Sequence, residues 1–212
     1  MKPILFNTEM VRAILDGRKT TTRRVIKLQP KYPLIQKISN GEWHEYSINP
    51  MADQIVNSPY GFGHIAPFHK GDVLYVRETW QCFNPYSDKE YVYKATNDCS
   101  DVINMRWTPS IHMPKEAARL FLHVTEVKAE RLQDITNAGA LAEGCDGRGL
   151  GSSSGCSGSL SVTPYNFSVE KFETVWDSTI KKSDIGRYGW DANPWVWVIK
   201  FERCEKEGEN HE

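Results

Sequence analysis

Hydrophobic and polar side chains alternate along several short stretches of this chain. Residues 73–80 and 91–95 have the alternation of two strands, and residues 84–88 between them suit the turn of a hairpin. Residues 120–127 predict a third strand, and residues 195–201 alternate large aromatic and aliphatic side chains, as a buried closing strand does. The pattern therefore predicts a fold built mainly from β-strands.

A helical period, in which apolar residues return to one face, predicts three further elements. Their expected bounds are Asn7 or Thr8 to Gly17, residues 134–144, and a longer helix that begins at Ser168. Ser, Thr and Asn are favoured helix caps, and glycine is favoured just after the last turn. Short helices between strands make the expected class mainly β with short helices, that is α+β, and favour a compact β-barrel.

Two long segments fall outside these elements. Residues 28–70 contain five prolines and read as a long connection with little regular structure, a kind of segment that often shapes a binding site. Residues 144–167 are rich in glycine and serine, which is typical of a flexible surface loop. We therefore expect a single domain over residues 1–204 with insertions at about 28–70 and 144–167, and a frayed tail at 205–212.

The overall charge predicts no general affinity for nucleic acid, because the net charge is −1 and the pI is about 6.6. Any RNA contact must come from a local basic cluster. The five cysteines are scattered and none forms a close CxxC pair, which predicts free thiols in a reducing cytoplasm. The N-terminal apolar run is too short for a signal peptide, and no stretch reaches the roughly 20 apolar residues that cross a bilayer. We expect a cytoplasmic protein with no membrane partner.

A dense basic cluster follows the first predicted helix. The segment 17–24 holds four cations, which are Arg18, Lys19, Arg23 and Arg24. We expect this segment to form part of a functional cleft that binds a nucleoside or RNA. Neighbouring cations destabilise a protonated amine, so the pKa of Lys19 could fall toward a value useful for a base. The same cluster could instead hold a phosphate, and a solvated surface charge is the plainer interpretation of Lys19 taken alone.

Three consecutive threonines, from Thr20 to Thr22, add hydroxyl groups to this cluster. Threonine is β-branched, so it also suits a strand for packing alone. In an extended segment Lys19, Thr21 and Arg23 would share one face, and Thr22 would lie on the other. A base at Lys19 and a nucleophile at Thr22 would then need a turn or bulge between them.

Charged residues also interrupt the apolar strand predicted at 73–80. Arg77 and Glu78 could pair with each other, since burying a lone charge is costly, or could contact a ligand. Trp80 follows Glu78 by two positions, so its side chain should point the same way, either to stack on a base or to fill the core. All three residues are therefore candidates for substrate binding.

Glu143 is expected at the C-terminal end of the second helix. A helix C-terminus disfavours an anion, so this position suggests a further role, although a solvated carboxylate is the plainer interpretation. His112 and His123 lack metal-ligand spacing, and no GxSxG, Walker A or GxGxxG motif occurs in a suitable context. The sequence predicts no metal site and no cofactor.

Together these segments resemble the ASCH domain, a branch of the PUA-like β-barrel superfamily. The resemblance rests on residues 14–24, 71–80, 132–136 and 140–144 together with the final strand, so it covers the core of nearly the whole chain. Residues 107–114 are similar to the longer ASCH proteins of phages and prophages. The implied fold is a PUA-like ASCH β-barrel that carries two long loop insertions.

The resemblance implies binding of RNA or of modified nucleobases. Small bacterial ASCH enzymes are amidohydrolases that remove the acetyl group of N4-acetylcytidine, and other members are ribonucleases or RNA-binding adaptors. The catalytic lysine, threonine and glutamate proposed for the amidohydrolases fall on Lys19, Thr22 and Glu143 by motif position. The residues expected to bind substrate are Arg18, Arg23, Arg24, Arg77, Glu78 and Trp80. The expected function is hydrolysis of an amide in a modified nucleoside, with a non-enzymatic RNA-binding module or a ribonuclease as alternatives.

Overall fold

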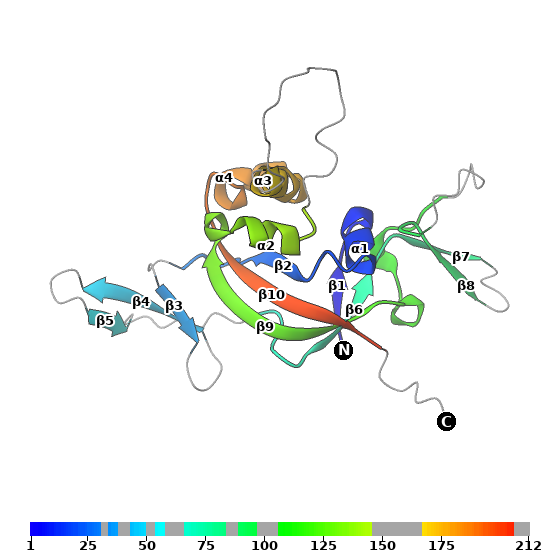
Figure 1. The fold of residues 1–212 in the computed structure, drawn as a ribbon, viewed down its shortest axis with the longest axis horizontal. Coiled ribbons are helices and arrows are strands. Elements are labelled where there is room, and N and C mark those ends of the chain that lie inside the picture. Colours follow the sequence, from blue (N-terminus) through cyan, green and yellow to red (C-terminus); the bar gives the residue numbers. More distant parts are fainter. Residues whose placement is uncertain are drawn as a thin grey trace, which may run out of the picture. The chain divides into compact units, whose positions relative to one another are not determined.

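The computed structural model describes residues 1–30, 34–37, 43–49, 54–57, 66–83, 89–96, 106–145 and 167–205. Strands and short helices alternate through these residues, and the helices are labelled α1 to α4 (Figure 1). The fold class is therefore mixed α+β, as the alternation of the two periods in the sequence predicts.

The largest sheet has five strands in the order β1-β6-β9-β10-β2. These strands are β1 (Lys2–Leu5), β6 (Val73–Arg77), β9 (Phe121–Arg131), β10 (Trp195–Cys204) and β2 (Thr21–Val25). The sheet is mixed, because β1 pairs parallel with β6 and β6 pairs antiparallel with β9. Both β9 and β10 are longer than their sequence patterns predict. Each continues past the clear alternation into a charged segment.

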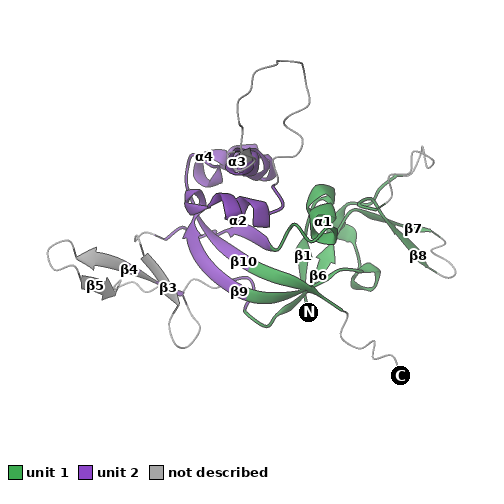
Figure 2. Cartoon of the chain, in the orientation of Figure 1, with its two compact units in different colours: residues 1–20, 70–125, 200–212 green, residues 21–69, 126–199 purple. Residues whose placement is uncertain are grey.

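The chain divides into two compact units (Figure 2). Unit 1 comprises residues 1–20, 70–125 and 200–212, and unit 2 comprises residues 21–69 and 126–199. No helix in the described part of the chain is long and apolar enough to cross a membrane.

In unit 1 the first helix, α1 (Thr8–Leu15), has the predicted start and stop. The Asn7 side chain accepts a hydrogen bond from the Met10 backbone N–H at 2.8 Å, which satisfies a donor that the helix itself leaves open. Gly17 has φ of +73°, a left-handed conformation that L-residues with a side chain rarely adopt. The chain therefore leaves α1 just before the basic segment.

The strand predicted over residues 73–80 is wrong in one respect, because it is two strands. β6 ends at Arg77, and β7 (Trp80–Phe83) forms a separate antiparallel hairpin with β8 (Glu90–Tyr93). At the break, the Glu78 backbone N–H donates to the Met113 sulfur at 3.2 Å instead of to a strand. The apolar alternation continues through the break, so periodicity alone could not locate it.

In unit 2 three helices pack on one side of the strands (Figure 2). They are α2 (Asn137–Ala142), α3 (Phe167–Thr179) and α4 (Ile185–Tyr188). The apolar faces of α2 and α3 enclose a core of Leu132, Ile135, Ala140, Cys145, Phe172, Trp176, Val196 and Val198. The prediction that Ser168 caps α3 is wrong, because the helix begins at Phe167, and the buried Ser168 hydroxyl has no hydrogen-bond partner among the described residues.

The segment over residues 28–70 contains regular structure, contrary to the prediction. Its described residues include β3 (Leu34–Lys37), β4 (Trp43–Asn49) and β5 (Gln54–Asn57), which form an antiparallel sheet in that order. The buried Trp43 ring meets the Trp197 ring edge-on at 5.3 Å between centroids. The many prolines favoured a loop prediction, and the two that the structure describes, Pro30 and Pro67, lie outside the strands.

A strained turn precedes β10 in unit 2. Asn193 has φ of +43°, and among the described residues it is the one non-glycine residue with a positive φ. Pro194 follows it. The Asn193 side-chain oxygen accepts the Gln133 backbone N–H at 2.9 Å, and its carbonyl accepts an Arg131 N–H at 3.1 Å. These bonds to a second segment hold the turn in its unfavourable conformation.

Candidate functional site

The first residues of β2 are buried on both faces of the strand. Thr21, Thr22 and Arg23 are 5%, 2% and 6% exposed. β2 is an edge strand of the five-stranded sheet, so one of its faces could be solvated. Successive side chains of a strand point to opposite faces, and all three of these side chains are buried, so both faces of β2 are covered here. The hydroxyl and guanidinium groups of these residues are therefore shielded from solvent.

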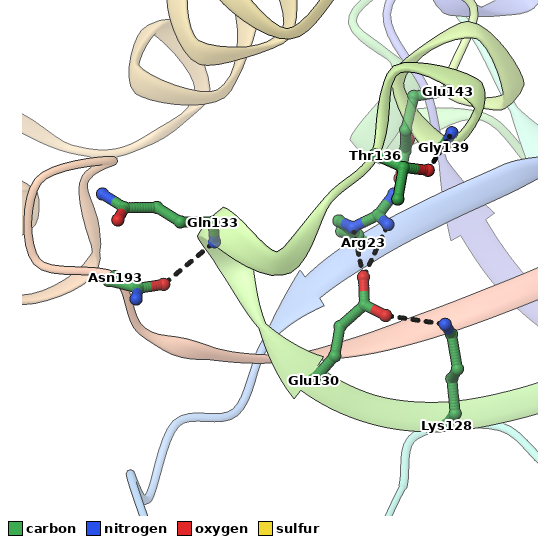
Figure 3. Close-up of polar contacts among 8 residues, drawn as sticks. All are labelled: Arg23, Lys128, Glu130, Gln133, Thr136, Gly139, Glu143 and Asn193. Atoms are coloured by element: carbon green, nitrogen blue, oxygen red, sulfur yellow. Dashed lines mark hydrogen bonds and ion pairs between the residues drawn. The ribbon is translucent and has the colours of Figure 1, made fainter.

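Arg23 bridges two carboxylates (Figure 3). Its Nη1 donates to Glu143 Oε1 at 3.0 Å, while its Nε and Nη2 donate to Glu130 Oε1 at 3.1 Å and 2.6 Å. The guanidinium carbon also lies 5.6 Å from the centroid of the Phe172 ring, within the range of a cation–π contact. The sequence predicts Arg23 as a substrate anchor, but the guanidinium already binds the protein's own carboxylates.

Glu143 is the C-cap residue of α2 and is buried, with 5% of its side chain exposed. A solvated helix-end carboxylate is therefore ruled out. The C-terminal end of a helix carries a partial negative charge, so an anion there needs a cation to offset it. The Arg23 guanidinium supplies that cation at 3.0 Å.

Arg24 is a second cation that acts on Glu143. Burial lowers the pKa of the Arg24 guanidinium below its ordinary value, and the Glu143 carboxylate partly offsets this by raising it. Arginine stays protonated under such shifts in proteins. The Glu143 carboxylate therefore lies in the field of two adjacent guanidinium groups on β2.

Glu130, near the end of β9, completes the network. Burial raises the pKa of its carboxyl, but hydrogen bonds and charge from Lys128 and Arg23 outweigh burial and leave the pKa below the ordinary 4.5. The Lys128 ammonium lies 2.7 Å from Glu130 Oε2, with 44% of the Lys128 side chain exposed. The network thus runs from a solvated lysine to the buried Glu143 through one guanidinium (Figure 3).

Gly139 of α2 lets the helix approach Arg23. A Cβ at this position would lie 3.3 Å from Arg23 Nη2 and 3.2 Å from Ile135 Cγ1, closer than most real contacts. The Gly139 N–H also donates to the Thr136 hydroxyl at 3.1 Å, so Thr136 caps the helix, which begins at Asn137 and not at the predicted residue 134. The position of Glu143 thus depends on a short, capped helix that presses against the arginine.

Lys19 belongs to unit 1 and is buried, with 2% of the residue exposed. Its Nζ lies 5.5 Å from the centroid of the Phe6 ring, and its backbone N–H donates to the Ala13 carbonyl at 2.9 Å. The solvated surface lysine, the plainer interpretation from the sequence, is therefore wrong. A buried amine is costly and is found where partners or a function compensate for lost hydration.

Arg18 behaves as an ordinary surface residue. Its Nη2 lies 2.8 Å from Asp16 Oδ2, and both side chains are partly solvated, with 34% and 57% exposed. Among the four cations of segment 17–24, Lys19 and Arg23 are buried, whereas Arg18 and Arg24 are half-buried.

The predicted pair of Arg77 and Glu78 is wrong. Glu78, 1% exposed, receives two hydrogen bonds from Arg119, at 2.9 Å from Nε and 3.0 Å from Nη2. An Nη2 of Arg77 donates to the Ile111 carbonyl instead. The Arg119 guanidinium also stacks at 4.0 Å over the Tyr93 ring, where burial raises the Tyr93 pKa and the Arg119 charge lowers it, with a net rise.

Trp80 fills the core of unit 1, the second of its two predicted roles. Its ring lies 5.8 Å from the Tyr91 ring centroid, against a cluster of buried residues that includes Met113 and Phe121. Its Nε1 is buried without a hydrogen-bond partner among the described residues. With Arg77 and Glu78, it belongs to unit 1.

Sequence reasoning missed Glu130, Lys128 and Arg119. Glu130 binds an arginine 107 positions away, and Arg119 binds a glutamate 41 positions away. The one sequence signal for these residues is weak, because it is only a charged side chain at or near the end of a predicted strand. Among the described residues, no three His, Cys, Asp or Glu side chains gather in a way that could hold a metal ion.

Comparison of the whole chain with protein-family models, with curated proteins and with solved structures finds no match. The function is therefore argued from the residues and their geometry.

Proposed function

We propose that this chain is a hydrolase that cleaves a linear amide of a modified nucleoside, of the N4-acetylcytidine type, on a PUA-like ASCH barrel. The supporting observation is the burial of the three residues at the catalytic positions of the resemblance. Lys19, Thr22 and Glu143 are 2%, 2% and 6% exposed. Enclosed titratable groups are typical of active sites, because enclosure is how an enzyme tunes their chemistry.

In this proposal Thr22 is the nucleophile. Its hydroxyl oxygen bonds to the amide carbonyl carbon, its proton passes to the Glu143 carboxylate, and the Lys19 ammonium stabilises the developing alkoxide. Arg24, or backbone amides near the turn that precedes β2, stabilises the oxyanion of the tetrahedral intermediate.

Glu143 then gives this proton to the exocyclic nitrogen. The carbon–nitrogen bond breaks, and the nucleoside leaves with a free amine. Glu143 next takes a proton from water, and the hydroxide attacks the threonyl ester to release a carboxylic acid. The proton held by Glu143 returns to the Thr22 oxygen, which restores the enzyme.

Arg23 supports this assignment as a positioning residue. Its bond to Glu143 Oε1, at 3.0 Å and buried, fixes the carboxylate on the C-cap of a helix only six residues long. A carboxylate that exchanges protons must be held in one orientation, and a second bridge to Glu130 holds the guanidinium itself. Proton transfer by such a group contributes about 10²–10⁴-fold to a rate.

The alternative of a non-enzymatic RNA-binding module that uses segment 17–24 has less support. Phosphate binding needs guanidinium or ammonium groups that can reach the ligand. Arg23 is bound to two carboxylates and Arg18 to Asp16, while Lys19 is enclosed. A ribonuclease remains a separable third function, tested by incubating labelled RNA with the chain in the presence of a metal chelator.

The test is release of cytidine from N4-acetylcytidine by the purified full chain. We expect turnover by wild type, none by Lys19→Met or Thr22→Ala, and a loss of about 10²–10⁴-fold in kcat for Glu143→Gln. Lys115→Met removes an exposed lysine and serves as the matched control for Lys19→Met, with activity unchanged. Wild-type activity no greater than that of Lys19→Met would refute the proposal.

A further inference from the structure

Four exposed cations of unit 2 lie in two segments that a hydrogen bond joins. Lys181, Lys182 and Arg187 lie in and before α4, within a run of seven consecutive exposed residues, 181–187. Lys27 is exposed after β2, and its carbonyl accepts a hydrogen bond from the Tyr188 hydroxyl at 2.9 Å. This bond brings Lys27, two residues beyond the end of β2, against the last residue of α4.

None of these four cations forms an ion pair with any residue that the structure describes. In contrast, two other partly exposed cations pair with carboxylates, Arg18 with Asp16 and Lys128 with Glu130. Asp184 is the one carboxylate within the exposed run 181–187, which also holds three of the cations, whereas the whole chain has a net charge of −1. The positive charge of this surface is thus available to an external anion.

Apolar and aromatic groups lie among the cations. Leu28 is 73% exposed and Ile185 is 40% exposed, while the Arg187 guanidinium stacks 5.1 Å from the Tyr188 ring centroid. Solvated large apolar side chains beside cations are typical of surfaces that contact unstacked bases and phosphates together. We call Lys27, Leu28, Lys181, Lys182, Ile185 and Arg187 the α4 surface.

We propose that the α4 surface binds the phosphate backbone of single-stranded RNA and thereby recruits the polymer that carries the modified nucleoside. This inference rests on the proposed function, because it names the form of the substrate. An anionic membrane is the competing partner, but α4 has only four residues and presents one exposed aliphatic side chain. That is far less than an interfacial amphipathic helix needs.

The experiment measures binding of a fluorescein-labelled 12-nucleotide single-stranded RNA to the full chain by anisotropy, across a series of salt concentrations. The affinity of wild type should fall with salt, because binding releases counterions at a slope of about −0.7 per neutralised phosphate. A triple variant, Lys181→Gln with Lys182→Gln and Arg187→Gln, should reduce that slope by about 2 and weaken binding at low salt by at least about tenfold.

The matched control removes three exposed lysines of unit 1, as Lys89→Gln with Lys94→Gln and Lys115→Gln. Equal losses in both triple variants, or no loss in the α4 variant, would overturn the proposal. So would failure of wild type to bind RNA, or binding to phosphatidylserine vesicles that the α4 variant abolishes while RNA binding persists. All substituted residues are exposed, and an unchanged melting temperature confirms that the variants fold.

Turnover of free N4-acetylcytidine, measured on the same proteins, separates the two proposals. The α4 variant should retain the wild-type rate on the free nucleoside, since it has no phosphate chain to bind. Absence of turnover in every protein would refute the hydrolase proposal alone, whereas RNA binding unaffected by the α4 substitutions would refute only the α4 surface.

Discussion

The Arg23 guanidinium decides what the basic segment 17–24 can do. The sequence predicts that a cation at this position binds phosphate. The Arg23 side chain is instead only 4% exposed and bridges Glu130 and Glu143. Buried ion pairs contribute little over an apolar substitute, yet removing one partner leaves the other charge uncompensated and is costly. Arg23 should therefore matter for stability as well as for the orientation of Glu143.

Replacing Arg23 by methionine should lower the free energy of unfolding by about 3–5 kcal/mol, because the buried Glu143 and the half-buried Glu130 each lose the guanidinium that binds them directly. Arg18→Met removes an arginine from a partly solvated pair and should cost less than about 1 kcal/mol. Urea unfolding of the two variants measures the difference. Adding Glu143→Gln to Arg23→Met should recover part of the loss, and equal effects of Arg23→Met and Arg18→Met would contradict the burial argument.

Sequence reasoning could name Lys19, Thr22 and Glu143 because they sit in local motifs. It could not assign partners, since the contact between Arg23 and Glu130 joins positions 107 residues apart. The same limit explains Glu78, whose nearest charged neighbour in sequence is Arg77 but whose partner in the fold is Arg119. Burial of charge was equally hidden, because it depends on what covers a residue and not on its neighbours in the chain.

The helices and strands that could be predicted are those whose ends carry local sequence signals, such as a capping residue or a terminal glycine. α1 has the expected cap, Asn7, and α1 and α2 are followed by the expected glycines, Gly17 and Gly144, both with positive φ. The strands within residues 28–70 were not predicted, because the prolines and glycines of this segment outweighed its short strand patterns. Such short strands are stable only when they pair with one another, as β3, β4 and β5 do. Helix ends are set by side chains a few residues away, whereas these strands depend on tertiary pairing.

Two glycine substitutions should have opposite effects, although a Cβ at either position would meet no atom within 4 Å. Gly17→Ala should destabilise by about 1–2 kcal/mol, since alanine is strained at its φ of +73°. Gly186 lies within α4 without a positive φ, so Gly186→Ala should be neutral or stabilise by up to about 1 kcal/mol. Thermal unfolding compares them, and losses of the same sign and size would contradict a backbone origin.

For the molecule as a whole, stability at acid pH should depend on the network around Glu130. Its pKa in the folded protein is lowered from 4.5, because bonds to Lys128 and Arg23 outweigh the opposing effect of burial. A depressed carboxyl pKa stabilises the fold above the unfolded-state pKa, and the contribution disappears as pH falls through the lower, folded-state value.

Glu130→Gln should therefore be less stable than wild type at pH 7, by about 1–3 kcal/mol, and the gap should narrow as pH falls below about 4.5. Glu116→Gln, at an exposed position, provides the comparison and should follow the wild-type curve. The free energy of unfolding from pH 2 to 7 is the measurement. A constant gap between Glu130→Gln and wild type over this range would show that charge is not the origin of the effect.

The turn at Asn193 has a consequence for how the protein ages. Asparagine in a left-handed turn is often followed by glycine, and such pairs deamidate when the next backbone nitrogen attacks the side-chain amide to form a succinimide. Here the next residue is Pro194, whose nitrogen carries no hydrogen, and the Asn193 oxygen is held by Gln133. Asn193 therefore has the left-handed conformation of many deamidation sites but lacks the backbone N–H that forms the succinimide. This turn should resist deamidation by that route during long storage.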